Sequence, residues 1–278
     1  MHDESKIREL SRIAKELRKQ SLRMITNSGA GHPGGSLSVA DILAVLYFHE
    51  MKIDPKNPNW AERDRLVISK GHASPPLYVA LAMRGFFGEE HLMTFDFVDS
   101  ILQGHPDMKK TPGIDMSSGS LGQGLSCAQG IALGGKLLGE PFRVYVILGD
   151  GECQEGQVWE AAMSAPVFKL DNLTAIVDYN QVQLASRLED SIPLEPIVDK
   201  WKSFGWNVMT IDGHKMEEII DSMEEAKACK GKPSVIIART IKGKGVAFME
   251  HKFEWHAKAP TADELQKALS ELDRSREV

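Results

Sequence analysis

The stretch of sequence that decides the fold reads VYVILGDGE at residues 144–152. Its apolar half predicts a buried strand, and Gly-Asp-Gly follows at the point where that strand ends. A second apolar run, residues 173–177, ends shortly before Asn180. Two parallel strands joined by one helix end at the same edge of a sheet, which is where α/β proteins bind ligands. The sequence therefore predicts that Asp150 and Asn180 lie side by side at a binding site.

The oxygen atoms of Asp150 and Asn180 suit a hard divalent cation. Mg²⁺ prefers six oxygen ligands, and the Val182 carbonyl is a third candidate from the protein, with Ca²⁺ and Mn²⁺ as alternative ions. Gly151 lets an anion approach the backbone closely, and a helix expected from Glu155 onward would point free N–H groups at phosphate. The pattern predicts a metal–diphosphate site, although Gly-Asp-Gly alone is also typical of an ordinary tight turn.

Composition excludes several other classes of function. The chain has 278 residues, 42% of them hydrophobic, and a formal net charge of −6, so it offers no polybasic surface for nucleic acid or membrane. Cys127, Cys153 and Cys229 have neither the spacing of a zinc site nor the density of a disulfide scaffold. Residues 1–13 are charged and lack the apolar core of a secretion signal. We expect a cytoplasmic protein without a nucleic-acid or membrane partner.

Helical and strand-like segments alternate along the whole chain without a linker or an internal repeat. This alternation predicts a single domain over residues 1–278, with a doubly wound α/β fold in which helices flank a mostly parallel sheet. An amphipathic helix should open it at about 5–28, and a helical extension should close it at about 251–278. Ser38 followed by Asp41 predicts a capping-box-like start of the second helix.

Three loops present a histidine directly after a glycine, at His32, His72 and His105. A lone histidine in a loop is usually a surface or capping residue. Metal binding by these histidines is not predicted, because they have neither i,i+4 spacing nor a cysteine partner. Hydrogen bonding and proton transfer suit an imidazole near neutral pH better.

Four motifs carry a resemblance to a known family. They are GHPGGSLS (31–38), RDRLVISKGHAS (63–74), GSLGQG (119–124) and GDGECQEG (149–156). The same motifs in the same order are found in the N-terminal, thiamine-diphosphate-binding domain of transketolases, which the chain resembles over nearly its whole length. The resemblance implies transfer of a two-carbon ketol unit from a ketose phosphate to an aldose phosphate, with thiamine diphosphate and a divalent metal.

The resemblance also assigns roles to individual residues. The metal ligands would be Asp150, Asn180 and the carbonyl of Val182. The cofactor-binding residues would be His72, Gly119, Ser120, Leu121, Gly151, Glu152 and Asn180. The residues that contact the sugar hydroxyls and assist proton transfer would be His32, His105 and His256. Glu155 and Glu160 resemble glutamates at the subunit interface, and a solvated helix face is their alternative reading.

Transketolases complete their active site with a glutamate from a second, pyrimidine-binding domain. This chain stops soon after a helix expected at 261–273, with no room for that domain. The resemblance therefore implies the N-terminal half of a split transketolase, inactive or nearly so by itself. A C-terminal subunit would supply the glutamate and most contacts to the sugar phosphate, in a heterotetramer, while the isolated half could form a homodimer.

Three departures from the family pattern leave the substrate open. Gln181, Ala185-Ser186 and Ala257 stand where glycine or an Asp-Gly turn is common, which indicates either a reshaped donor pocket or a different loop path. Pentose phosphates, branched sugars and sulfonated sugars all remain candidates. One alternative function is the α subunit of a thiamine-dependent 2-oxoacid dehydrogenase, which has no use for the Gly-His loops. The other is a non-catalytic scaffold, which has no need of the metal ligands.

Overall fold

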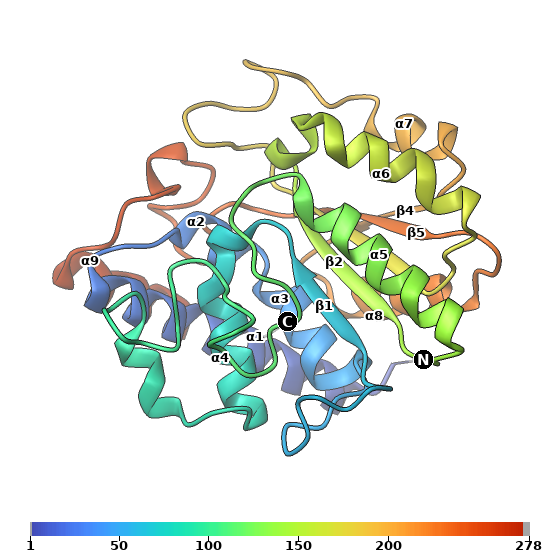
Figure 1. Cartoon of the computed structure of the whole chain (residues 1–278). Coiled ribbons are helices and arrows are strands. Elements are labelled where there is room, and N and C mark those ends of the chain that lie inside the picture. Colours follow the sequence, from blue (N-terminus) through green and yellow to red (C-terminus); the bar gives the residue numbers. More distant parts are fainter. Residues whose placement is uncertain (1, 275–278) are drawn as a thin grey trace.

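The computed structural model describes residues 2–274 and confirms the predicted fold class (Figure 1). Five parallel strands form one sheet in the order β1-β2-β3-β5-β4. The strands are β1 (Arg65–Ile68), β2 (Val144–Gly149), β3 (Leu173–Tyr179), β4 (Asn207–Asp212) and β5 (Ser234–Arg239). Their near-continuous apolar sequences follow from burial of both faces of a parallel sheet.

Helices cover the two faces of the sheet. They are α1 (Glu4–Ser28), α2 (Pro33–Ser38), α3 (Ala40–Val45), α4 (Ser74–Arg84), α5 (Gln123–Leu138), α6 (Gly156–Val167), α7 (Ile197–Ser203), α8 (Met216–Ala228) and α9 (Ala262–Arg274). Short helical turns add Leu46–Glu50, Gly71–Ala73, Glu89–Thr94, Gly151–Gln154 and Phe253–Trp255. Among the described residues, none of the helices combines the length and the apolar composition that crossing a membrane requires.

Side-chain alternation along each strand divides the core in two. Tyr145 and Ile147 of β2 pack in the cluster formed with α1, α3, α4 and α8. Val146 and Leu148 pack on the opposite face, in the cluster formed with α5, α6 and α7. Because both layers are filled, the sheet is fixed between them, and its carboxyl edge carries the loops that build the site.

The predicted capping box at Ser38 is wrong. The N-cap of α3 is Val39, which makes no side-chain capping bond. The Ser38 hydroxyl instead donates to the carboxylate of Asp178 (2.6 Å), and Asp41 forms a buried ion pair with Arg18. Both polar side chains thus have charged partners in the core, and tertiary contacts override the local helix signal.

Candidate active site

Asp150 and Asn180 meet at the carboxyl edge of the sheet, as the sequence predicted from their strands. Strands β2 and β3 pair in register, so that Gly149 lies opposite Asp178. Asp150 is 3% exposed, and its carboxylate accepts the N–H groups of Gly151 (2.7 Å) and Gln181. Gln181 has φ +63°, one of the departures from glycine noted above, and in this conformation its N–H points at Asp150. The hydrogen bond offsets a backbone strain on the order of 1 kcal/mol.

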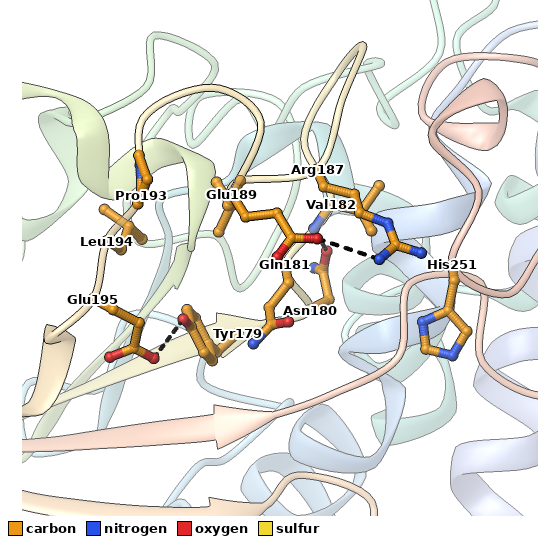
Figure 2. Close-up of a pocket in the computed structure, with 11 residues that line it drawn as sticks. Tyr179, Asn180, Gln181, Val182, Arg187, Glu189, Pro193, Leu194, Glu195 and His251 are labelled. Carbon is orange, nitrogen blue, oxygen red and sulfur yellow. Dashed lines mark hydrogen bonds and ion pairs between the residues drawn. The ribbon is translucent and has the colours of Figure 1, made fainter.

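The other two candidate ligands lie in the loop that follows β3 (Figure 2). The Asn180 amide donates to Asp178 (3.2 Å), and its oxygen accepts the N–H of Val182 (3.1 Å). The Val182 carbonyl accepts a hydrogen bond from the ammonium group of Lys242 (2.9 Å). A cationic group therefore already contacts one of the three candidate ligand oxygens.

Asp178 and Lys70 form an ion pair at the base of the site. Both side chains are almost fully buried, at 0% and 2% exposed. Asp178 also accepts the hydroxyl protons of Ser38 and Thr240, and Lys70 also donates to the Gly35 carbonyl (3.0 Å). Burial opposes ionisation of Asp178, but the charge of Lys70 and these hydrogen bonds hold its pKa below the ordinary value. Sequence analysis missed this pair, and its only local signal was a charged residue at the end of an apolar run.

The Asp150 carboxylate, unlike that of Asp178, makes no ion pair with any residue that the structure describes. Burial, reinforced by the charge of Asp178, raises the pKa of Asp150 to about 6. Lys242 is the nearby cation, and burial lowers its pKa to about 8. A buried carboxylate satisfied only by backbone N–H groups is costly, and a divalent ion would relieve that cost.

The donor set fits an oxygen-preferring ion. Nowhere in residues 2–274 do three or more His, Cys, Asp or Glu side chains group as they would around a metal. An ion at Asp150 would therefore rely on amide and carbonyl oxygens, which suits Mg²⁺, Ca²⁺ or Mn²⁺ better than a softer transition metal.

Glu152 points into the protein. Its buried carboxylate accepts the Ser69 hydroxyl and the N–H groups of Gly122 (2.9 Å) and Gly149 (2.9 Å). Burial raises its pKa. The side chain thereby joins the ends of β1 and β2 to the loop of residues 119–124, called the glycine loop below, which contains predicted cofactor-binding residues. All the hydrogen-bond donors to its carboxylate come from the protein itself.

The glycine loop lies close to the histidine loops. Gly119 has φ +150°, and a Cβ there would lie 3.4 Å from the ring of His105. The neighbouring Ser118 hydroxyl is buried against Gly71 and has no hydrogen-bond partner in the described part of the protein. Ser120 and Leu121 are exposed beside it. The loop therefore offers an exposed surface at Ser120 and Leu121, close to His105.

Four imidazoles from distant parts of the chain form one cluster. The ring of His32 lies 5.2 Å from His72, 6.0 Å from His105 and 5.4 Å from His256, and His72 lies 5.1 Å from His256. Burial, aided by His105, lowers the pKa of His32 to about 4, and burial with Lys242 lowers that of His256 to about 3. The pKa of His72 falls in the same direction, again chiefly by burial. These three rings are neutral near pH 7, so each both donates and accepts hydrogen bonds.

Two cavities flank these groups. One of about 700 Å³ is lined by His32, His105, Asp96 and Lys109, among others, and opens beside the imidazoles. The other, of about 420 Å³, lies along the loop after β3, where Tyr179 donates to Glu195 (2.8 Å; Figure 2). The first has the polar lining expected of a sugar-binding site.

The two predicted interface glutamates are both exposed. Glu155 directly precedes α6 and packs over Gly122, where a Cβ would lie 2.7 Å from that of Glu155. Glu160 lies one turn further along α6. Their exposure leaves both available to a partner.

Polar side chains and imidazoles gathered at the carboxyl edge of a parallel sheet are typical of the class of α/β proteins that bind a ligand there. Residues 10–275 match the family described as transketolase, thiamine diphosphate binding domain. The chain belongs to this family.

Individual relatives agree with that assignment. The chain is 49% identical over 266 residues to the 6-deoxy-6-sulfo-D-fructose transketolase subunit SqwG of Clostridium sp. (strain MSTE9), covering 96% of this chain and 97% of that protein. It is 41% identical over 255 residues to one of the subunits of the apulose-4-phosphate transketolase of Phocaeicola vulgatus, covering 92% and 90%. The crystal structure of transketolase from Campylobacter jejuni superposes with a TM-score of 0.91 at 34% identity, over 98% of this chain but 43% of that one.

Proposed function

We propose that this chain is the cofactor-binding subunit of a two-chain transketolase, which moves a two-carbon ketol unit from a ketose phosphate or a related anionic ketose to an aldose phosphate. The observation that carries the proposal is the cluster of four imidazoles beside Asp150 and Asn180, in which burial keeps His32, His72 and His256 neutral near pH 7. The subunit names of the relatives from Clostridium and Phocaeicola, which the chain matches over 97% and 90% of their lengths, support a separate partner.

The residues around Asp150 fit a divalent ion and a diphosphate. Asp150, Asn180 and the Val182 carbonyl would hold the ion, with Mg²⁺ as first choice, while Gly151 and His72 would contact the diphosphate. Bound thiamine diphosphate supplies the carbon nucleophile and the electron sink that ketol transfer needs. Lys242 adds a positive charge on the same side, which favours an anion there.

The imidazoles of His32, His105 and His256 would bind the sugar. A neutral imidazole offers one donor and one acceptor, which matches a hydroxyl group, and it can pass a proton between them. Burial lowers the pKa values of His32 and His256 well below 7, so these two rings add no positive charge to the sugar pocket. Nδ1 of His256 already accepts from Lys242, so this ring would offer its N–H.

The remaining functions fall to the partner. A C-terminal subunit would supply the activating glutamate and most of the phosphate contacts, so this chain alone would be inactive or nearly so. Exposed Glu155 and Glu160 would lie at a subunit interface of a cytoplasmic heterotetramer.

The test is reconstitution with the partner chain, thiamine diphosphate and Mg²⁺, followed by a panel of donors and acceptors. The panel contains xylulose 5-phosphate with ribose 5-phosphate, which would place the enzyme in the pentose phosphate pathway. It also contains apulose 4-phosphate and 6-deoxy-6-sulfo-D-fructose, the sugars in the names of the relatives. We expect ketol transfer from at least one donor and none from this chain alone. A folded, cofactor-loaded pair that transfers from no ketose but decarboxylates a 2-oxoacid would overturn the proposal.

A further inference from the structure

A second buried network lies behind the candidate active site. Its members are Arg18 on α1, Asp41 on α3, His214 in the loop between β4 and α8, and the backbone of Ile241 just after β5. We propose that Arg18, Asp41 and His214 form a positioning relay, which holds the Ile241 backbone and thereby places Lys242 in the site.

The hydrogen-bond pattern fixes the tautomer of His214. The Ile241 N–H lies 2.8 Å from Nε2 of His214, and Nδ1 lies 2.7 Å from the Asp41 carboxylate. Because an amide N–H only donates, Nε2 is the acceptor, and the ring proton sits on Nδ1 and is donated to Asp41. An Asp–His pair of this kind resembles a catalytic dyad, but here the lone pair of Nε2 is already used. His214 therefore cannot take a proton from a substrate, and we assign it a structural role.

The rest of the relay is rigid. Arg18 makes two hydrogen bonds to the Asp41 carboxylate and a third to the Leu37 carbonyl (3.0 Å), and both charged side chains are under 10% exposed. Burial alone would raise the pKa of Asp41, but Arg18 and His214 together lower it to about 2. The carboxylate is thus ionised at any working pH and orients the imidazole from behind.

Lys242 tolerates little displacement. It is 3% exposed, and its ammonium contacts the Val182 carbonyl (2.9 Å) and Nδ1 of His256 (2.9 Å). Its methylene groups press on Gly34, where an added Cβ would lie 3.0 Å away. The backbone on either side is fixed by the bond from Ile241 to His214 and by the bond from Gly243 to the Gly34 carbonyl (3.0 Å). The Lys242 carbonyl also accepts the N–H of His251 (3.0 Å). Releasing the Ile241 N–H therefore removes one of the bonds that hold this segment and loosens it on the side before the lysine.

If Lys242 moves, an anionic cofactor should bind more weakly, and only this consequence rests on the proposed function. Its test therefore uses chemistry that needs no cofactor. The full chain is treated with an amine-acetylating reagent, and the rate of modification of each lysine is followed by mass spectrometry. Lys70, which is buried in the same site, is the internal reference for general unfolding.

Two variants separate the two hydrogen bonds of the ring. His214→Gln keeps an acceptor near the position of Nε2, whereas His214→Asn keeps only a donor near that of Nδ1. We expect His214→Asn to speed acetylation of Lys242 by roughly tenfold, as the loss of one hydrogen bond predicts, with Lys70 unchanged. His214→Gln keeps the acceptor for Ile241 but loses the donor to Asp41, so its rate should lie between those of the wild type and His214→Asn. Equal protection of Lys242 in both variants, or equal exposure in both, overturns the relay.

A measurement on the wild-type chain covers the case in which His214→Asn does not fold. Hydrogen exchange at the Ile241 amide should be slowed by its bond to His214. An Ile241 amide that exchanges like a free one would also overturn the proposal. Failure of the ketol-transfer test would leave both of these results unaffected, so the two hypotheses fail separately.

Discussion

The buried imidazoles should make the stability of this chain depend on pH between 7 and 5, and replacing His32 by asparagine should remove part of that dependence. Asparagine keeps a hydrogen-bonding side chain of similar polarity but cannot take up a proton in this range. His32 is the ring that contacts the three other members of the cluster, so it is the most direct probe of their shared environment.

The magnitude follows from the shift of the His32 pKa, from 6.5 in the unfolded chain to about 4 in the folded one. As pH falls below 6.5 the unfolded chain binds a proton that the folded chain refuses, so stability is complete above that value and declines toward pH 4. By pH 5 the shift corresponds to about 2 kcal/mol. Because the ring is partly exposed, solvent screening reduces the expected loss to about 1 kcal/mol.

The assay is urea unfolding of the isolated chain at pH 7 and pH 5, with matched variants. His49→Asn, at an exposed histidine outside the cluster, is the control. Between the two pH values, His32→Asn should lose about 1 kcal/mol less stability than the wild type, whereas His49→Asn should follow the wild type. If His32→Asn declines as steeply as the wild type, the ring is not desolvated in the folded chain and its proposed neutrality fails.

Three further predictions concern single side chains. Asp150→Asn should weaken binding of Mg²⁺ and thiamine diphosphate to the reconstituted pair by more than about 100-fold, because it removes the charge of a metal ligand. Calorimetry measures this, and unchanged affinity would refute the metal assignment. His105→Gln should lower turnover by roughly 10²-fold with the cofactor still bound, as for loss of a proton-transfer group; loss of cofactor instead would show that His105 is misplaced. Glu152→Gln should cost about 1–3 kcal/mol in urea unfolding, since one of its donors then faces an NH₂ group, and wild-type stability would contradict a structural role for the three hydrogen bonds of Glu152.

The sequence predicted the parts of this structure that rest on local patterns. Apolar runs and the residues at their ends fixed the strands, and parallel pairing of β2 with β3 then brought Asp150 to Asn180, because the ends of parallel strands share one edge. The glycine before each of His32, His72 and His105 indicated loops that present these histidines at the surface of a site. Their convergence on His256 followed from the family resemblance and not from spacing.

The charged partners could not be predicted, because they are set by tertiary packing. Lys70 and Asp178 are 108 residues apart, and Asp41 and His214 are 173 apart. A lone lysine or aspartate in sequence is most often solvated, and nothing local shows that it will be buried with a partner. The same cause made the capping prediction at Ser38 wrong, since its hydroxyl serves Asp178 across the core.

The distribution of buried charge explains why the protein can fold before the cofactor binds. Asp178 is neutralised by Lys70, and Glu152 is satisfied by three donors, so neither carboxylate needs an added ion for the fold to stand. Within the described residues Asp150 makes no ion pair and accepts only two backbone N–H groups, and its raised pKa reports the cost. A bound ion would therefore relieve mainly the desolvation cost of Asp150, and metal affinity should depend more on Asp150 than on the other buried carboxylates. On this argument Asp150→Asn removes an unfavourable buried charge, which offsets the cost of turning an NH₂ group toward one backbone N–H. The variant should therefore lose cofactor while its urea midpoint falls less than that of Glu152→Gln.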